Sequence, residues 1–288
     1  MNGNRIALAL AGAALAGALG LPGAKGQDAA GEKLTVRQIV DKTNYVAYYQ
    51  GADGRAKVNM TITDARGQKR TRQFTILRWD KPRPAGEAPK DAAKADEANT
   101  GEQKFYVYFQ LPADVNKMAF LVHKHLDKDD DRWLYLPALD LVKRISSADK
   151  RTSFVGSHFF YEDVSGRNVE ADKHELLETS KDYYVLKNTP KDPASVEFAH
   201  YKMWIHRKTF VVVQISYYDK DGKEYRRYNA LKVETVQAHP TVVKSSMADL
   251  RDKSHSLLEY SDVKYDAGVP ESVFTERYLR KPPTEYLK

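Results

Sequence analysis

The stretch DRWLYLPALDLVKRISSADKRTSFVGSHFFYEDV, residues 131–164, decides the fold of this 288-residue chain. In its first half, Trp133 and Tyr135 alternate with other side chains up to Pro137, and an alternating pair of leucines follows. This spacing predicts two half-buried strands joined by a tight turn. The second half mixes basic with small polar residues and ends in the aromatic run HFFY at 158–161, next to two acidic residues.

The motif W-x-Y-L-P…R-I…F-x-G-S-x-F-x-Y-E-D in this stretch resembles the LolA-like outer-membrane lipoprotein-sorting proteins. Two later segments, MWIHRKTFVVVQISYY at 203–218 and VPESVFTER at 269–277, resemble the same family. The resemblance implies a mainly β (α+β) fold, namely a LolA-like unclosed antiparallel β-barrel with a few lid helices. It also implies a periplasmic location, since relatives with the best-known role hold lipid acyl chains while crossing the periplasm.

Alternation with a period of two recurs along the rest of the chain. Residues 55–63 and 68–79, for example, predict an antiparallel hairpin with one solvent-exposed face. The pattern predicts about eleven strands, which is too many for a flat open sheet in one small domain, so the sheet should curl. One helix is expected before them, because Thr35 and Gln38 fit an N-capping box that opens a helix running to about Tyr49.

Two segments are expected to lie outside this sheet. Residues 1–26 combine a basic start, an apolar run and small residues at the end, which is typical of a cleavable export signal. A retained membrane anchor is the alternative, but glycine and alanine make the run weakly apolar. Residues 81–104 contain no apolar side chain larger than alanine, which predicts a disordered loop. The remaining chain, 27–288, is interpreted as one LolA-like domain that is soluble in the periplasm.

Composition narrows the possible partners. The chain has no cysteine, which excludes disulfides and lipidation at an N-terminal cysteine. Its formal net charge of +7 is a mild bias that favours transient contact with an anionic membrane surface. No nucleic-acid recognition motif is present, so nucleic acid is not an expected partner.

Motifs that carry catalysis are missing from the sequence. There is no G-x-S-x-G elbow, P-loop or Rossmann glycine pattern, so we predict that the chain is not an enzyme and needs no cofactor. The run from His174 to Glu178 begins like a zinc-protease motif but has Glu178 in place of the second histidine. His123 and His125 share a strand face with Asp127 nearby, yet two solvent-facing histidines are the simpler interpretation, and no metal site is predicted.

A curled sheet encloses an interior that its own side chains fill or that an apolar ligand occupies. The alternating pattern fits both arrangements. The resemblance favours an open cavity, and implies a periplasmic carrier that moves lipid or the acyl chains of lipoproteins between the inner and outer membranes. A second interpretation is an adaptor for an inner-membrane transporter of the resistance-nodulation-division (RND) type, without a ligand of its own. Lipid extraction from the purified protein would separate the two.

The predicted lipid-binding lining follows the inward-facing positions of the strands, although a single β-bulge would exchange the two faces of a strand. The lining residues are Val58, Met60, Ile62, Phe74, Ile76, Phe105, Val107, Phe109, Met118, Phe120, Val122, Trp133, Tyr135, Val211, Val213 and Ile215. Phe120 distinguishes an open pocket from a filled core. In an open pocket the Phe120→Glu variant folds but loses an apolar ligand, whereas in a filled core it does not fold. We expect the folded protein.

Overall fold

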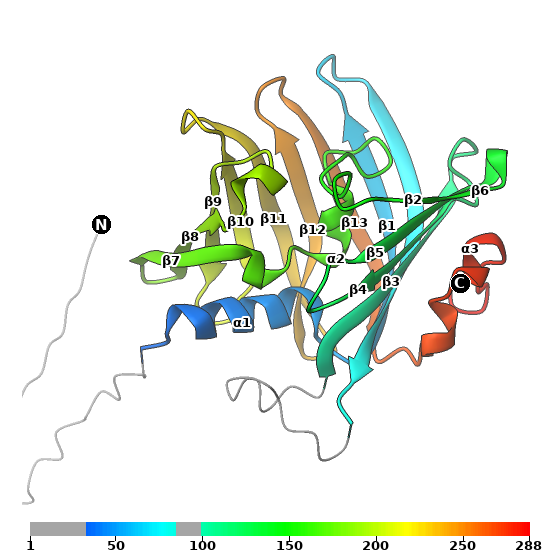
Figure 1. Cartoon of the computed structure of the whole chain (residues 1–288), viewed down its shortest axis with the longest axis horizontal. Helices are drawn as coiled ribbons and strands as arrows, with labels where there is room; N and C mark the ends of the chain where they lie inside the picture. The colour runs from blue at the N-terminus through cyan, green and yellow to red at the C-terminus, as the bar shows by residue number, and fades with distance from the viewer. Residues whose placement is uncertain (1–32, 85–98) are drawn as a thin grey trace, which may run out of the picture. The chain divides into compact units, whose positions relative to one another are not determined.

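The computed structural model describes residues 33–84 and 99–288, most of which form β-strands (Figure 1). The strands are β1 (Asp53–Thr63), β2 (Lys69–Pro82), β3 (Asn99–Leu111), β4 (Ala119–Lys124), β5 (Asp131–Leu136), β6 (Leu141–Arg144), β7 (Asp172–Thr179), β8 (Tyr183–Pro190), β9 (His200–His206), β10 (Val212–Tyr218), β11 (Glu224–Val236), β12 (His239–Asp249) and β13 (Ser254–Tyr265). The three α-helices of these ranges are α1 (Val36–Tyr48), α2 (Tyr161–Ser165) and α3 (Arg277–Arg280).

All thirteen described strands belong to one antiparallel sheet. Their order in space is β6-β5-β4-β3-β2-β1-β13-β12-β11-β10-β9-β8-β7. The first strand therefore pairs with the last, while β6 and β7 remain as the two edges, and within the described ranges the curled sheet does not close. This confirms the predicted unclosed antiparallel fold. The sheet has two more strands than the roughly eleven expected; the four-residue β6 is too short to carry a clear alternation.

The hairpin predicted near the start of the chain is formed by β1 and β2, in which Val58 lies opposite Phe74. Because both residues face the same side, they contribute together to the interior. On its other edge, β1 pairs with β13, which places Met60 opposite Leu258. The first and last strands thus bring apolar residues far apart in the sequence onto one surface.

Helix α1 begins at the predicted capping box. The Thr35 hydroxyl accepts from the Gln38 backbone N–H at 3.2 Å, and the Gln38 side-chain oxygen accepts from the Thr35 N–H at 2.8 Å. These bonds satisfy donors that an uncapped helix would leave unpaired. The apolar side of the helix buries Ile39 and Val40 against side chains of the sheet that include Leu186. Helix α1 is thereby fixed across one end of the curled sheet (Figure 1).

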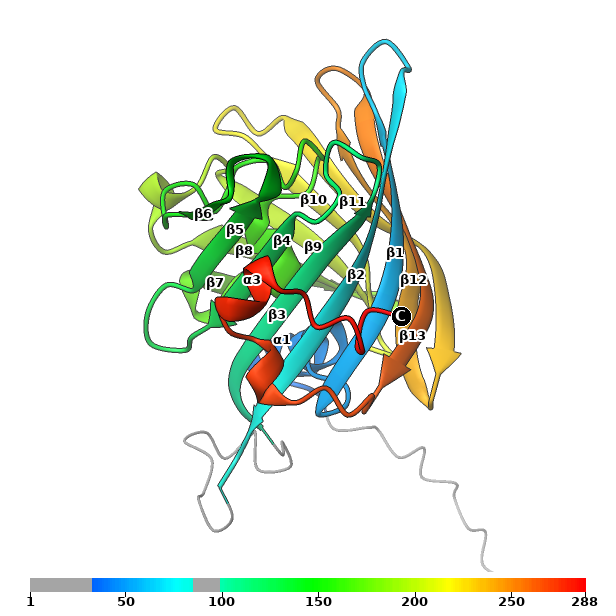
Figure 2. The same cartoon turned by 90° about the vertical axis from the view of Figure 1, so that its right-hand side faces the viewer.

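Apolar side chains cover both faces of the sheet from β2 to β5. The inner face belongs to a large core that includes Met60, Phe109 and Phe120. The outer face packs against the C-terminal segment, where Phe274 and Leu279 are buried; Figure 2 shows this segment lying across the outer surface of these strands. A strand covered on both faces is apolar at both alternating positions, so its sequence does not reveal which face is the inner one.

Strands enter the segment that was predicted to be a disordered loop, residues 81–104, from both ends. Strand β2 continues to Pro82 and β3 begins at Asn99, and these two residues pair. The Gln103 side chain is buried and donates to an Asp80 carboxylate oxygen at 2.8 Å. Residues 85–98 and the predicted export signal at 1–26 lie outside the described residues.

Candidate functional site

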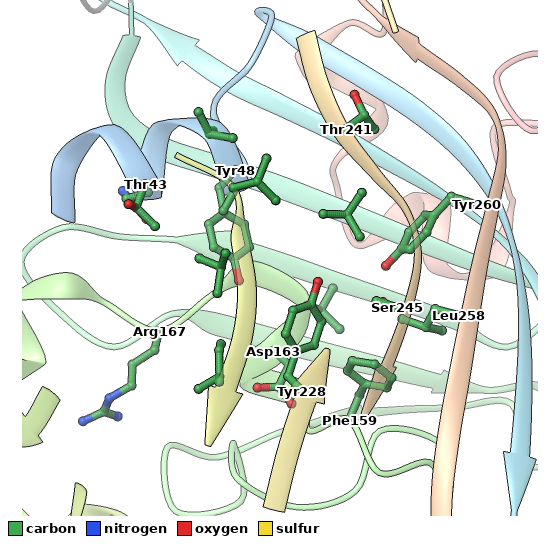
Figure 3. Close-up of a pocket in the computed structure, with 18 of the residues that line it drawn as sticks. Thr43, Tyr48, Phe159, Asp163, Arg167, Tyr228, Thr241, Ser245, Leu258 and Tyr260 are labelled. Atoms are coloured by element: carbon green, nitrogen blue, oxygen red, sulfur yellow. The ribbon is translucent and has the colours of Figure 1, made fainter. Parts of the chain in front are cut away.

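A cavity of about 450 Å³ lies between α1 and the inner face of the sheet. Its wall comes from α1, from β1–β3 and β7–β13, and from the connection between β6 and β7. Figure 3 shows Thr43 and Tyr48 reaching into it from the helix, opposite Tyr228 and Tyr260 from the sheet. The volume falls within the roughly 300–1,000 Å³ that is typical of ligand pockets.

Half of the sixteen predicted lining residues surround this cavity. They are Val58, Met60, Phe74, Ile76, Phe105, Val107, Val211 and Ile215. Five more share the inner face but pack into the solid core beside the cavity, namely Ile62, Phe109, Met118, Phe120 and Val122. Alternation therefore located the inner face of β1–β4, but it did not separate the open part of the interior from the filled part. Lipid binding by these residues remains a prediction.

The filled part is an aromatic plug formed by Phe74, Phe109, Phe120, Phe154 and Tyr161. The Phe154 ring lies 5.4 Å from Phe120, 5.6 Å from Tyr161 and 5.8 Å from Phe109, measured between ring centroids. Phe154 and Tyr161 belong to the second half of the stretch at 131–164, which folds into the interior. Phe120 is 0% exposed, so the expectation that it faces an open pocket is wrong. The interior is filled at the plug and open toward α1.

Trp133 and Tyr135 were predicted to face inward, and this prediction is wrong. In β5 the inward residue is Leu134, which belongs to the inner core. Trp133 and Tyr135 lie on the outer face, where they pack with the C-terminal segment. The C-terminal segment covers the outer face of β5, so aromatic side chains pack there as well. The larger side chains of β5 therefore did not identify the inner face.

The predicted inward position of Val213 is also wrong, because β10 contains a β-bulge. Its register with β9 shifts between Val212 and Gln214, which leaves Val213 as the extra residue. A bulge of this kind exchanges the faces of the residues on its two sides. As a result, Val211, Val212 and Ile215 line the cavity in place of a strictly alternating set.

A network of buried charges anchors the connection between β6 and β7 over the interior. Arg151 donates to Glu162 at 2.9 Å and, through two nitrogens, to Glu197 at 2.6 and 3.0 Å. Arg226, which is 4% exposed, donates to Asp163 at 2.5 Å and lies 4.0 Å from the centre of the Phe160 ring. Glu162 and Asp163 are the acidic pair that ends the decisive stretch. Their arginine partners include residues far along the chain, so the sequence did not reveal the pairing.

Two more buried charged residues, Lys124 and Asp80, lie where α1 meets β2–β4. Lys124 donates to the Ser165 backbone oxygen at 2.7 Å, and its ammonium lies 5.1 Å from the centre of the Tyr48 ring. Burial lowers the pKa of Lys124 to about 8, against the attraction of Asp130. Burial also raises the pKa of Asp80 to about 6, although Arg78 favours the charged form. Arg78 and Gln103 each donate to the Tyr48 backbone oxygen at 2.7 Å, which holds the C-terminal end of α1 at the cavity.

The histidines considered as metal ligands bind other partners. A His123 ring nitrogen lies 2.8 Å from the Phe274 backbone oxygen, and the ring packs edge-on against Trp133. His125 pairs with Asp131 at 2.9 Å. His174 contacts Asn188 and the Val169 backbone oxygen. Across residues 33–84 and 99–288, no three potential metal-binding side chains converge.

Several polar residues of the cavity were not identified from the sequence. They are Thr43, Tyr48, Asp163, Asn188, Tyr228, Ser245 and Tyr260. Thr43 and Asn188 are buried, and within the described residues the Thr43 hydroxyl and the Asn188 side-chain nitrogen have no hydrogen-bond partner. Alternating tyrosines on strands indicate only an amphipathic face, so nothing local distinguished Tyr228 from a core tyrosine.

A family model with the description "Uncharacterized protein" matches residues 101–281, which is more than half of the chain. The comparison with curated proteins gave no match. None of the described helices has the length and apolar character needed to span a membrane.

Solved structures share the fold over most of the chain. A DUF1329 family protein from Desulfovibrio piger is 25% identical with a TM-score of 0.72, over 85% of this chain and 97% of that one. A domain described as outer membrane lipoprotein-sorting, from Vibrio parahaemolyticus, is also 25% identical with a TM-score of 0.72, over 85% of this chain and 100% of that one. A LolA superfamily protein from Nitrosomonas europaea is 19% identical with a TM-score of 0.61, over 85% and 100% of the two chains.

Proposed function

The chain belongs to the family whose model matches residues 101–281 and is LolA-like, and on this premise we propose that it is a periplasmic carrier without catalytic activity. Its cargo is a lipid or the acyl chains of a lipoprotein, carried between the inner and outer membranes. The observation that supports the proposal is the cavity of about 450 Å³ between α1 and the sheet. An interior filled throughout by side chains would leave no place for such a cargo.

The composition of the wall fits an apolar ligand. Met60, Phe74 and Val107 are buried apolar side chains of the sheet that line the cavity, and Val40 of α1 lies on the other side. Each methylene moved from water into such surroundings contributes about 0.8 kcal/mol, so a sixteen-carbon chain gains on the order of 10 kcal/mol before ordering costs. That gain is sufficient for carriage and small enough for release at a second membrane.

Lipid extraction followed by mass spectrometry tests the proposal on protein purified from the periplasm without detergent. A carrier yields close to one lipid per chain, and its N-terminus begins near residue 27 if the predicted export signal is removed. An adaptor of an RND-type transporter, the other function considered, yields no lipid above the background of a protein without a cavity. That result, together with recovery of a transporter in cross-linking, would replace the carrier with the adaptor.

A further inference from the structure

Four tyrosines converge on the open part of the cavity; Tyr217 is buried, and Tyr48, Tyr228 and Tyr260 are partly buried. This tyrosine cluster consists of Tyr48 from α1, Tyr217 from β10, Tyr228 from β11 and Tyr260 from β13, all of which line the cavity. In Figure 3 the hydroxyls of Tyr48, Tyr228 and Tyr260 point toward the same region. Three strands and one helix therefore bring polar groups to one place within an otherwise apolar wall.

Two hydroxyls of the cluster form no hydrogen bond with the described residues. In the described part of the chain, neither the Tyr48 nor the Tyr217 hydroxyl makes a hydrogen bond to another protein group. Ser245 also lines the cavity and favours the charged forms of Tyr228 and Tyr260, and has no such effect on Tyr48 or Tyr217. A tyrosine hydroxyl beside an apolar wall normally pairs with a protein group, water or a ligand. The cluster therefore has spare hydrogen-bonding capacity directed into the cavity.

The position of Tyr48 is fixed by its surroundings. Its ring packs so closely on Gly166 that a Cβ at residue 166 would come within 2.4 Å of the ring. The Lys124 ammonium lies 5.1 Å from the ring centre. Burial raises the pKa of Tyr48, and the nearby Asp163 carboxylate adds to this effect, so the hydroxyl stays protonated and able to donate. The protein thus holds at the cavity a hydrogen-bond donor that forms no hydrogen bond within the described residues.

Asp163 supplies an acceptor beside the cluster. One of its carboxylate oxygens, Oδ2, accepts from the Phe160 backbone N–H at 2.7 Å and from Arg226 at 2.5 Å. Within residues 33–84 and 99–288, no protein donor reaches the other oxygen, Oδ1. Because Arg226 balances the Asp163 charge, the site favours an uncharged group over a cation. An anionic group has no proton to donate to Oδ1.

We propose that the cargo is a lipid with an uncharged hydroxyl group, which exchanges hydrogen bonds with the tyrosine cluster and Asp163 while its hydrocarbon part occupies the apolar wall. The proposal rests on the carrier function above and narrows its ligand. A hydroxyl both donates and accepts, so it matches the tyrosines and the free carboxylate oxygen together. A carboxylate or phosphate group cannot donate to Asp163, so it matches the tyrosines but not the free carboxylate oxygen.

Competition against a neutral fluorescent probe, N-phenyl-1-naphthylamine, tests this proposal on the mature protein. The competitors are 1-hexadecanol, methyl palmitate and palmitate, which share chain length but end in a hydroxyl, an ester and a carboxylate. We expect 1-hexadecanol to displace the probe at least fivefold more effectively than the other two, since one neutral hydrogen bond changes affinity by about that factor. Equal displacement by all three would mean that water satisfies the hydroxyls, and would overturn the proposal.

Variants that remove tyrosine hydroxyls but keep the rings test whether the tyrosine cluster binds the hydroxyl group of 1-hexadecanol. Tyr48→Phe combined with Tyr217→Phe, which removes the two hydroxyls that make no hydrogen bond within the described residues, should weaken 1-hexadecanol about fivefold to twenty-fivefold and leave probe binding within about twofold. Tyr108→Phe is the matched control, because Tyr108 is a half-buried tyrosine of the outer-face cluster. Unchanged affinity for 1-hexadecanol in the double variant overturns the inference while the carrier function stands. Failure of the wild type to bind any probe contradicts the carrier function itself.

Discussion

At the scale of single residues, Phe120 shows how the interior is divided. Its ring is fully buried and lies between Phe154 and Tyr161 of the aromatic plug. Phe120→Ala should lower the free energy of unfolding by about 3–5 kcal/mol, because neighbours only partly close the space left by a buried ring. Phe120→Glu should not fold, since it buries an unpaired charge.

Urea denaturation and circular dichroism measure both effects for Phe120, with Ile76→Ala as the comparison. Ile76 is only partly buried and lines the open cavity, so its truncation removes fewer contacts and should cost clearly less than Phe120→Ala. A folded Phe120→Glu protein would show that the plug is loosely packed, and would restore the expectation from the sequence.

Asp80 should make stability depend on pH. Its pKa is raised from 3.8 to about 6 in the folded protein, so between these values only the folded state holds the proton. The resulting stabilisation is complete below about pH 3.8 and is lost as the pH rises through about 6. The free energy of unfolding of the wild type, relative to Asp80→Asn, should therefore fall by up to about 3 kcal/mol between about pH 4 and about pH 7.

Asparagine is a suitable reference at position 80 because its side-chain oxygen can still accept from Gln103, whose amide nitrogen lies 2.8 Å from the Asp80 carboxylate. Paired urea titrations of the two proteins at several pH values cancel the contributions of all other groups. A difference that stays constant, or that grows with rising pH, would mean that Asp80 is charged throughout in the folded protein.

At the scale of elements, the junction between α2 and α1 depends on Gly166. This residue has a φ of +77°, and an added Cβ would lie 2.4 Å from the Tyr48 ring. Gly156 has nearly the same φ, +76°, but no atom within 4 Å of an added Cβ. Gly156→Ala should thus report backbone strain alone, about 1–2 kcal/mol, and Gly166→Ala should cost roughly 1–3 kcal/mol more because of the clash. Equal losses in urea unfolding would show that Tyr48 moves away freely.

The elements also show what the sequence could predict. The capping box at Thr35 opens α1 as expected, because its hydrogen bonds join residues only three apart. The face of β5 could not be predicted, since the covering segment at 269–287 is distant in the sequence. The face of β10 was misassigned because the bulge at Val213 has no local signature. Structure that depends on neighbouring residues could thus be predicted from the sequence, and packing between distant segments could not.

At the scale of the whole molecule, the decisive stretch at 131–164 contributes in two ways. Its first half forms β5 and β6 at one edge of the sheet. Its second half turns into the interior, supplies Phe154 and Tyr161 to the aromatic plug, and supplies Glu162 and Asp163 to the buried charges. The resemblance carried by this stretch predicted the unclosed sheet correctly. The position and size of the cavity depend on how far the plug extends, which only the assembled structure shows.

Whether the cavity holds an apolar ligand is tested most directly by filling it. Ser245 is a buried, small residue of the cavity wall on β12, and its neighbour Ser246 is half-buried and lies outside that wall. Ser245→Trp should place an indole in the cavity, whereas Ser246→Trp adds the same side chain outside it. Equilibrium titration with N-phenyl-1-naphthylamine, on proteins shown to be folded by circular dichroism, should give one saturable site in the wild type and in Ser246→Trp. We predict loss of that site in Ser245→Trp, and unchanged binding in a folded Ser245→Trp protein would contradict an apolar ligand site in this cavity.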